Sequence, residues 1–417
     1  MKKRLLVIII ICIVIITGLF VSKFYNEYRE SITEISFDSK EQTNEETEYE
    51  PTIDEIVQQE IQQMSLREKI GQMIVVSYRT LGYNDELDQI LNTVKPGGFI
   101  LFSENIDTYS QITEYISKIK ETADIPMLIG IDQEGGRVQR IKKLPDANVL
   151  EIPSMYTLGK TGNAELSKRV GAVLASEIAA FGINLDYAPT LDIYSNPNNT
   201  VIGDRAFGSD YKTVIDMAIP FSQGMRENGI IPVYKHFPGH GDTDSDSHVE
   251  LPVVNKTKEE LYESELLPFK AAIEDGAQVI MVAHIALPKL TGNYMPSTLS
   301  REVVTELLRD ELNFDGVITT DAVNMKALSD NYSIEEICNY SINAGVDMIL
   351  MPDNPIEVVD IIEKLVEEGA ITEERIDESV KRILELKHNN NLYNKIDLNK
   401  DNIGTQEHID IINQIYE

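Results

Sequence analysis

Residues 279–285, VIMVAHI, form an almost unbroken apolar run between two segments of helical periodicity. A strand with one face in water alternates polar and apolar residues, whereas a strand buried on both faces is apolar nearly throughout. Seven other runs share this composition and are bounded by Gly or Pro. They begin at Met73 (MIVVS), Gly97 (GGFILF), Pro126 (PMLIGID), Gly182 (GINLDYAP), Ile230 (IIPVYKHF), Gly316 (GVITTD) and Val346 (VDMILMP).

Segments of helical period separate these runs, for example residues 163–181 and 258–275. Repeated strand-helix units with apolar strands predict an α/β fold with a parallel sheet buried on both faces. Eight units favour closure into a (β/α)8 TIM barrel. An open, doubly wound sheet is the alternative that the same pattern allows.

The N-terminus carries a membrane signal. After MKKR, residues 5–21 (LLVIIIICIVIITGLFV) hold no charge and approach the length that crosses a bilayer core. No small-x-small cleavage site follows, which favours a single-pass anchor over a signal peptide. Because basic residues precede the span, we expect the rest of the chain to lie outside the cytoplasm at the cell membrane, or to be secreted if the segment is cleaved.

The composition after the span indicates a tether and then one folded domain. Residues 38–50 (DSKEQTNEETEYE) have the acidic, polar composition of a solvated linker. Cys12 and Cys338 fall in different parts of the chain, so no disulfide is expected. The predicted parts are an anchor or signal segment (1–30), an acidic linker (31–50), a barrel domain (51–390) and a C-terminal tail (391–417) with a short final helix near 407–416.

The formal net charge of −32 argues against polyanionic partners. A chain this acidic repels nucleic acid and anionic lipid surfaces over a Debye length of about 10 Å. A neutral substrate fits the charge better.

Polar residues occur where the barrel prediction places an active site, at the carboxyl ends of the strands. Asp132, Lys235, His236 and Asp321 end their runs or follow them directly. His284 also follows a run, but we interpret it as a buried, hydrogen-bonded histidine and not as a catalytic residue.

Residues 235–248, KHFPGHGDTDSDSH, concentrate three histidines and three aspartates. His236 and His240 have the spacing of metal ligands on a helix, but Pro238 and Gly239 predict a turning loop, so we expect no metal and no other cofactor. Acid/base chemistry fits better. In an extended loop Asp246 and His248 project to the same side, where a carboxylate can orient an imidazole and raise its pKa. A purely structural Asp-His pair is the alternative.

Four stretches together resemble the catalytic domain of glycoside hydrolase family 3, in particular its bacterial β-N-acetylglucosaminidase branch, over about residues 52–390. The stretches are IGIDQEGGRVQR (129–140), IGDRAFG (202–208), KHFPGHGDTDSDSH (235–248) and TTDAVNM (319–325). The resemblance implies a (β/α)8 barrel that hydrolyses terminal, non-reducing β-linked N-acetylglucosamine of cell-wall-derived glycans through a covalent intermediate.

The resemblance also implies roles for individual residues. Asp321 is the expected nucleophile, and His248, oriented by Asp246, is the expected general acid/base. The residues expected to hold the sugar are Asp132, Arg140, Arg205, Lys235 and His236. Glu134, Arg137 and His240 are expected to brace the loops.

Three other functions remain open from the sequence. Phosphate can replace water as the attacking group, which would make the protein a β-N-acetylglucosaminide phosphorylase. The barrel can also serve as a non-catalytic cell-wall-binding protein, or as a metal-dependent hydrolase.

Overall fold

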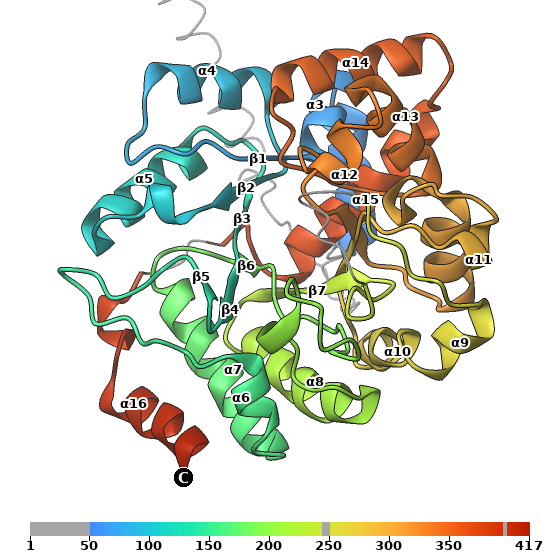
Figure 1. The fold of residues 1–417 in the computed structure, drawn as a ribbon. Coiled ribbons are helices and arrows are strands. Elements are labelled where there is room, and N and C mark those ends of the chain that lie inside the picture. The colour runs from blue at the N-terminus through green and yellow to red at the C-terminus, as the bar shows by residue number, and fades with distance from the viewer. Residues whose placement is uncertain (1–50, 244–250, 395–397) are drawn as a thin grey trace, which may run out of the picture. The chain divides into compact units, whose positions relative to one another are not determined.

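The computed structural model describes residues 51–243, 251–394 and 398–417, and it contains eight parallel strands (Figure 1). Each strand lies inside one of the eight apolar runs. The strands are β1 (Ile74–Val76), β2 (Gly98–Leu101), β3 (Leu128–Ile131), β6 (Leu185–Asp186), β7 (Ile231–Phe237), β8 (Val279–Val282), β9 (Val317–Thr320) and β10 (Ile349–Leu350).

The sheet closes on itself. Its hydrogen-bonded order is β10-β1-β2-β3-β6-β7-β8-β9. The two ends of this order are joined where Thr319 of β9 pairs in parallel with Met348, which precedes β10. The Thr320 N–H also donates to the Met348 carbonyl at 3.0 Å. The barrel prediction is confirmed, and the open doubly wound sheet is excluded.

Helices follow the strands and form the outer layer of the barrel (Figure 1). Every residue of β2, β3, β8 and β9 is buried, as expected for strands covered on both faces. The outer elements are α4 (Asp85–Val94), α5 (Tyr109–Glu121), α7 (Ala164–Ala179), α8 (Tyr211–Glu227), α9 (Lys258–Glu263), α10 (Leu266–Glu274), the π-helical η4 (Glu302–Glu311), α13 (Ile334–Ala344) and α14 (Pro355–Glu367). Shorter elements within loops are η1 (Ser103–Asn105), α6 (Met155–Gly159), η2 (Gly203–Arg205), α11 (Pro288–Thr291), η3 (Ser297–Leu299), α12 (Lys326–Ser329) and η5 (Lys400–Asn402).

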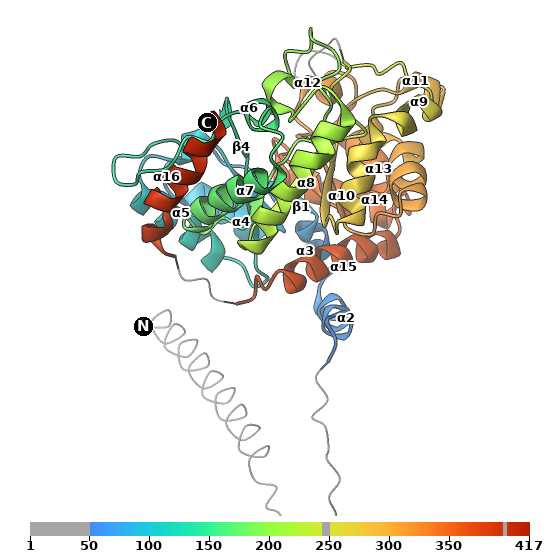
Figure 2. The ribbon, with the colours of Figure 1, turned by 90° about the horizontal axis from the view of Figure 1, so that it is seen from below.

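Three further helices lie together near the amino ends of the strands: α2 (Ile53–Gln63), α3 (Leu66–Gln72) and α15 (Glu373–Asn389) (Figure 2). A capping box formed by Ser65 and Glu68 starts α3. Lys387 on α15 is fully buried and donates to the Gln72 side chain at 2.6 Å. Its hydrogen bond links α15 to α3.

The structure departs from the sequence prediction at residues 258–275, which form two helices instead of one. The break lies at Ser264, which has φ −144° and ψ −78°. The next side chain, Glu265, turns inward, is buried and forms an ion pair with Lys256. The chain therefore leaves the helical path to place a carboxylate beside a lysine that precedes α9.

The C-terminal segment packs against the barrel. The expected final helix is α16 (Gln406–Asn413), which is followed by η6 (Gln414–Tyr416) and lies beside α7 (Figure 2). Two hydrogen bonds hold the segment: the Gly404 N–H donates to Glu177 at 2.8 Å and Arg169 donates to Gln414 at 2.9 Å.

The predicted anchor (1–30) and linker (31–50) lie outside the described residues. Within the described part of the chain, no helix combines the length and the apolarity that crossing a bilayer requires.

Candidate active site

A pocket of about 480 Å³ opens at the carboxyl ends of the barrel strands. Six of the eight predicted site residues line it together: Asp132, Arg140, Arg205, Lys235, His236 and Asp321. The other two, Asp246 and His248, lie outside the described residues. The barrel thus gathers side chains that come from four separate stretches of the sequence.

Five charged side chains alternate in sign along the floor of this pocket. Asp132 accepts hydrogen bonds from Arg140 at 3.0 Å and from Lys235 at 2.9 Å. The Lys235 ammonium also lies 2.6 Å from the carboxylate of Glu134. Glu134 in turn accepts two hydrogen bonds from Arg205, at 2.7 and 2.8 Å. The order is therefore Arg140, Asp132, Lys235, Glu134, Arg205.

This alternation keeps the buried groups ionised. Burial by itself would raise the pKa of Asp132, but Lys235 and Arg140 hold that pKa below its usual value. Burial would lower the pKa of Lys235, but Asp132 and Glu134 raise it. The floor therefore presents fixed charges to a substrate at neutral pH.

Glu134 reaches the floor because the chain reverses there in a small antiparallel hairpin, β4 (Gln133–Gly135) and β5 (Val138–Gln139), which the sequence analysis missed. Gly135 and Gly136 have φ values of 100° and 56°, which favour glycine. The pair of glycines in DQEGGR was the available signal for this turn. We expected Glu134 to brace a loop, but it lies at the centre of the charged floor.

Arg137 does brace a loop, as expected. It donates to the carbonyl oxygens of Thr200 and Val201 at 2.8 and 2.6 Å and forms an ion pair with Asp204 at 3.2 Å. These contacts hold the segment that leads into Arg205.

Asp192, which the sequence analysis did not single out, positions His236. Its fully buried carboxylate lies 2.6 Å from Nδ1 of His236 and accepts a hydrogen bond from the His240 N–H at 2.7 Å. Burial would raise the pKa of Asp192, but His236 lowers it. An ionised partner requires a proton on Nδ1 and leaves Nε2 of His236 facing Arg205, 3.4 Å away.

His240 lines the pocket and is almost fully buried. Burial, followed by the nearby His236, lowers the pKa of His240 to about 4. Its Nδ1 lies 2.8 Å from the Thr243 hydroxyl. His240 is therefore neutral at physiological pH.

Among the described residues, no three His, Cys, Asp or Glu side chains lie where they could share a metal ion.

Asp321 follows β9, and its backbone N–H donates to the Val282 carbonyl at 3.0 Å. Burial would raise the pKa of its carboxyl group, but His284, His236 and the Ala322 N–H lower it. The Ala322 N–H donates to the carboxylate at 2.7 Å. The pocket therefore holds an ionised carboxylate in a fixed orientation, which is the form of a nucleophile.

His284 is a buried, hydrogen-bonded histidine, as interpreted from the sequence. Its Nδ1 lies 2.8 Å from the Thr298 hydroxyl and its Nε2 lies 3.0 Å from the Ala322 carbonyl. A carbonyl oxygen only accepts, so Nε2 carries a proton. His284 thereby links the β8 loop to the residue that follows Asp321.

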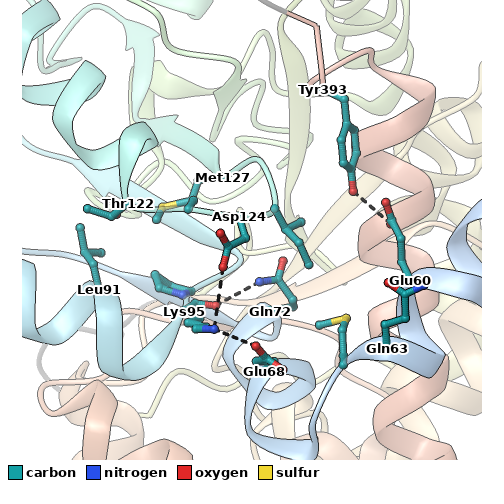
Figure 3. A pocket seen from close by; sticks show the side chains of 14 residues that line it. Glu60, Gln63, Glu68, Gln72, Leu91, Lys95, Thr122, Asp124, Met127 and Tyr393 are labelled. Atoms are coloured by element: carbon teal, nitrogen blue, oxygen red, sulfur yellow. Dashed lines mark hydrogen bonds and ion pairs between the residues drawn. The ribbon is translucent and has the colours of Figure 1, made fainter. Parts of the chain in front are cut away.

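A second cavity, of about 210 Å³, is formed partly by the loops that lead into β2 and β3, at the opposite end of these strands (Figure 3). Lys95 lies there between Glu68 and Asp124, at 2.7 and 3.9 Å, and Tyr393 donates to Glu60 at 3.1 Å. None of the predicted site residues lines this cavity. The candidate active site is therefore the pocket at the carboxyl ends.

Comparison with known proteins identifies the family of the chain. Residues 65–386 match the family described as the glycosyl hydrolase family 3 N-terminal domain. The chain is 34% identical over 328 residues to β-hexosaminidase A of Pseudoalteromonas piscicida, and the alignment covers 72% of this chain. The alignment covers 55% of that relative, so this chain spans little more than half of the relative's length.

Solved structures share the fold. A glycoside hydrolase family 3 β-N-acetylglucosaminidase from Paenibacillus sp. str. FPU-7 is 35% identical with a TM-score of 0.81, over 84% of this chain and 68% of its own. A β-glucoside phosphorylase is 29% identical with a TM-score of 0.79, over 87% of this chain and 66% of its own.

Proposed function

Since the chain belongs to glycosyl hydrolase family 3, we propose that it is an exo-acting, retaining β-N-acetylglucosaminidase. The observation that carries the proposal is the ionised, oriented Asp321 beside the charged floor of one pocket. The β-hexosaminidase and β-N-acetylglucosaminidase among its relatives support the choice of an N-acetylated sugar.

The reaction has two steps. In the first, the Asp321 carboxylate attacks the anomeric carbon while the bond to the leaving oxygen breaks and His248 donates a proton to that oxygen. In the second, His248 accepts a proton from water, and the resulting hydroxide displaces Asp321 and restores the β configuration. Asp246 orients the imidazole. The roles of His248 and Asp246 rest on the sequence motif alone.

The floor of the pocket holds the sugar. Asp132 has carboxylate oxygens that accept hydrogen bonds from hydroxyl groups, whereas Lys235, Arg140 and Arg205 donate. Each of these groups is already fixed by an oppositely charged neighbour. A substrate therefore meets polar groups that need little reorganisation, which favours attack in a defined geometry.

We further propose that the enzyme is tethered to the outer face of the cell membrane and acts on cell-wall-derived glycans. The support is the uncharged stretch at residues 5–21, the basic residues before it and the acidic linker after it. The boundaries proposed for these parts are those given by the composition: 1–30, 31–50, 51–390 and 391–417.

Release of p-nitrophenol from its β-N-acetylglucosaminide and its β-glucoside tests the proposal. We expect the acetamido substrate to react faster, and Asp321→Ala to lower kcat by at least about 1000-fold. Asp401→Ala, at an exposed position on η5, is the matched control. A folded wild-type protein that cleaves neither substrate, or prefers the glucoside, would contradict the proposal.

Phosphorolysis is the second candidate, because a β-glucoside phosphorylase shares the fold. The same assay with inorganic phosphate separates the two reactions by product. A sugar 1-phosphate indicates phosphorolysis, and free N-acetylglucosamine indicates hydrolysis.

A further inference from the structure

His284 follows β8, is fully buried and makes a hydrogen bond through each ring nitrogen. Its Nε2 lies 3.0 Å from the Ala322 carbonyl, and its Nδ1 lies 2.8 Å from the Thr298 hydroxyl. Nε2 carries a proton, because a carbonyl oxygen only accepts. The charge of the ring therefore depends on Nδ1, which either accepts the hydroxyl proton of Thr298 or donates a proton to the hydroxyl oxygen.

The Thr298 hydroxyl decides between these two states, because it has a single hydrogen and three close polar neighbours. Besides Nδ1 of His284, its oxygen lies 2.9 Å from the Ala283 carbonyl and 3.1 Å from the Val282 carbonyl. If the hydrogen pointed to Nδ1, the hydroxyl and carbonyl oxygens would face each other in a buried place with no proton between them, which is unfavourable. If the hydroxyl donates to a carbonyl, Nδ1 must donate to the hydroxyl. Only this second arrangement satisfies every contact, and it gives His284 a proton on both nitrogens.

The charges around the neighbouring pocket favour the same state. His236 adds no positive charge, because its Nε2 faces the guanidinium donors of Arg205 and accepts. Arg79 and Lys326 also line the pocket but are exposed, where solvent and salt screen them. The other charges that the structure describes here are four carboxylates (Asp132, Glu134, Asp192 and Asp321) and three cations (Arg140, Arg205 and Lys235). An imidazolium at His284 balances them, which lowers the cost of burying charge.

Asp321 is the carboxylate on which this charge acts. Burial would raise the pKa of Asp321, and His284 is the first of the neighbours that lower it. Ala322 connects the two side chains, since its N–H donates to the Asp321 carboxylate at 2.7 Å and its carbonyl accepts from His284. The other described titratable groups that interact with Asp321 are His236 and Lys235 on β7 and the neutral His240 after β7.

We propose that His284 is an imidazolium at neutral pH and that its charge keeps the Asp321 carboxylate ionised as the pH falls. His284 does not line the pocket, so it is a positioning residue that acts through Asp321. This role rests on the proposed function, in which Asp321 is the nucleophile and must be ionised to attack. The charge of the ring rests on the hydrogen bonds alone.

Nuclear magnetic resonance of the full-length chain, labelled with nitrogen-15 in its six histidine rings, tests the charge. In an imidazolium both ring nitrogens carry a proton and resonate at similar frequencies, whereas in a neutral ring their frequencies are widely separated. Contact of the ring N–H protons with the Thr298 methyl group assigns the signals of His284 in the wild type. We expect two ring N–H signals from His284 at pH 7, and the neutral pattern would overturn the inference.

The pH profile of kcat/KM for p-nitrophenyl β-N-acetylglucosaminide tests the role. Its acidic limb reports the ionisation of the nucleophile in the free enzyme. His284→Gln keeps an amide donor for the Ala322 carbonyl but removes the charge. We therefore expect the acidic limb to move to higher pH by about one unit, which is about a 10-fold loss of kcat/KM at a pH on that limb. His408→Gln, on α16 and away from the pocket, is the control and should retain the wild-type limb.

An acidic limb at the same pH in wild type and in folded His284→Gln would overturn the role of His284. If His284→Gln does not fold, the spectrum of the wild type still decides the charge, because its assignment needs no substitution. No turnover by folded wild type would contradict the proposed function instead, and the same spectrum would show whether the ring is charged.

Discussion

Glu134 is the position where one substitution tests both the stability and the electrostatics of the pocket. Its buried carboxylate accepts three short hydrogen bonds from two cations, at 2.6 Å from Lys235 and at 2.7 and 2.8 Å from Arg205. Glu134→Gln preserves the shape but replaces one oxygen with an amide donor. At least one cationic donor then faces another donor, and two buried cations share one fewer negative charge.

The expected loss can be worked from these contacts. A hydrogen bond to a charged group contributes about 1.5–3 kcal/mol, and removing one partner of a buried ion pair costs about 3–5 kcal/mol. Because glutamine keeps one acceptor, we expect the free energy of unfolding to fall by about 3 kcal/mol at pH 7. We also expect kcat/KM to fall about 10- to 100-fold, since Lys235 and Arg205 lose their fixed positions.

The pH dependence adds a second check. Burial would raise the pKa of Glu134, but Arg205 and Lys235 lower it below its usual value of about 4.5. Its contribution to stability is therefore present above the unfolded pKa and is lost as pH falls towards the folded pKa. The difference between wild type and Glu134→Gln should shrink below about pH 4.5.

Urea unfolding followed by circular dichroism measures the change, because the chain has no Trp to report by fluorescence. Glu306→Gln, at an exposed position on η4, is the matched control and should leave the midpoint nearly unchanged. A loss of less than about 1 kcal/mol with an unchanged m-value, or a difference that grows on acidification, would refute this reasoning.

Two further buried groups, Asp186 and Lys387, give predictions of opposite sign for the change of stability with pH. Burial raises the pKa of Asp186 well above its usual value, and one of its carboxylate oxygens has no partner among the described residues. Wild-type stability should therefore fall as pH rises through the interval between its unfolded and folded pKa values. Asp186→Asn should remove this fall and gain at least about 1 kcal/mol at pH 7 in urea unfolding. Burial also lowers the pKa of Lys387 to about 7, so Lys387→Met should be about 1–4 kcal/mol more stable at pH 7. That gain should shrink as pH rises from about 7 to 10.5, because removing the proton from the unfolded lysine costs less free energy as pH rises. Thermal unfolding at several pH values across this interval measures the change.

Local sequence patterns were enough to predict the fold class. The eight apolar runs each contain a strand, because strands buried on both faces are apolar over most of their length. The position of the site followed from the same argument, since Asp132 and Asp321 come directly after β3 and β9. The split of residues 258–275 into two helices was not predictable in this way, because the break at Ser264 accompanies a contact of Glu265 with Lys256, which lies outside the segment.

The sequence by itself thus indicated the eight strands of the main sheet, their parallel direction and which residues stand at their carboxyl ends. Only the tertiary structure decided how those residues pair. Lys235 and Asp132 are 103 residues apart in sequence, and Arg205 and Glu134 are 71 apart. Nothing local to either stretch specifies such a contact. It depends on the closure of the barrel and on the hairpin that returns Glu134 to the floor, because ion pairs form where side chains meet in space and not where they lie in the chain.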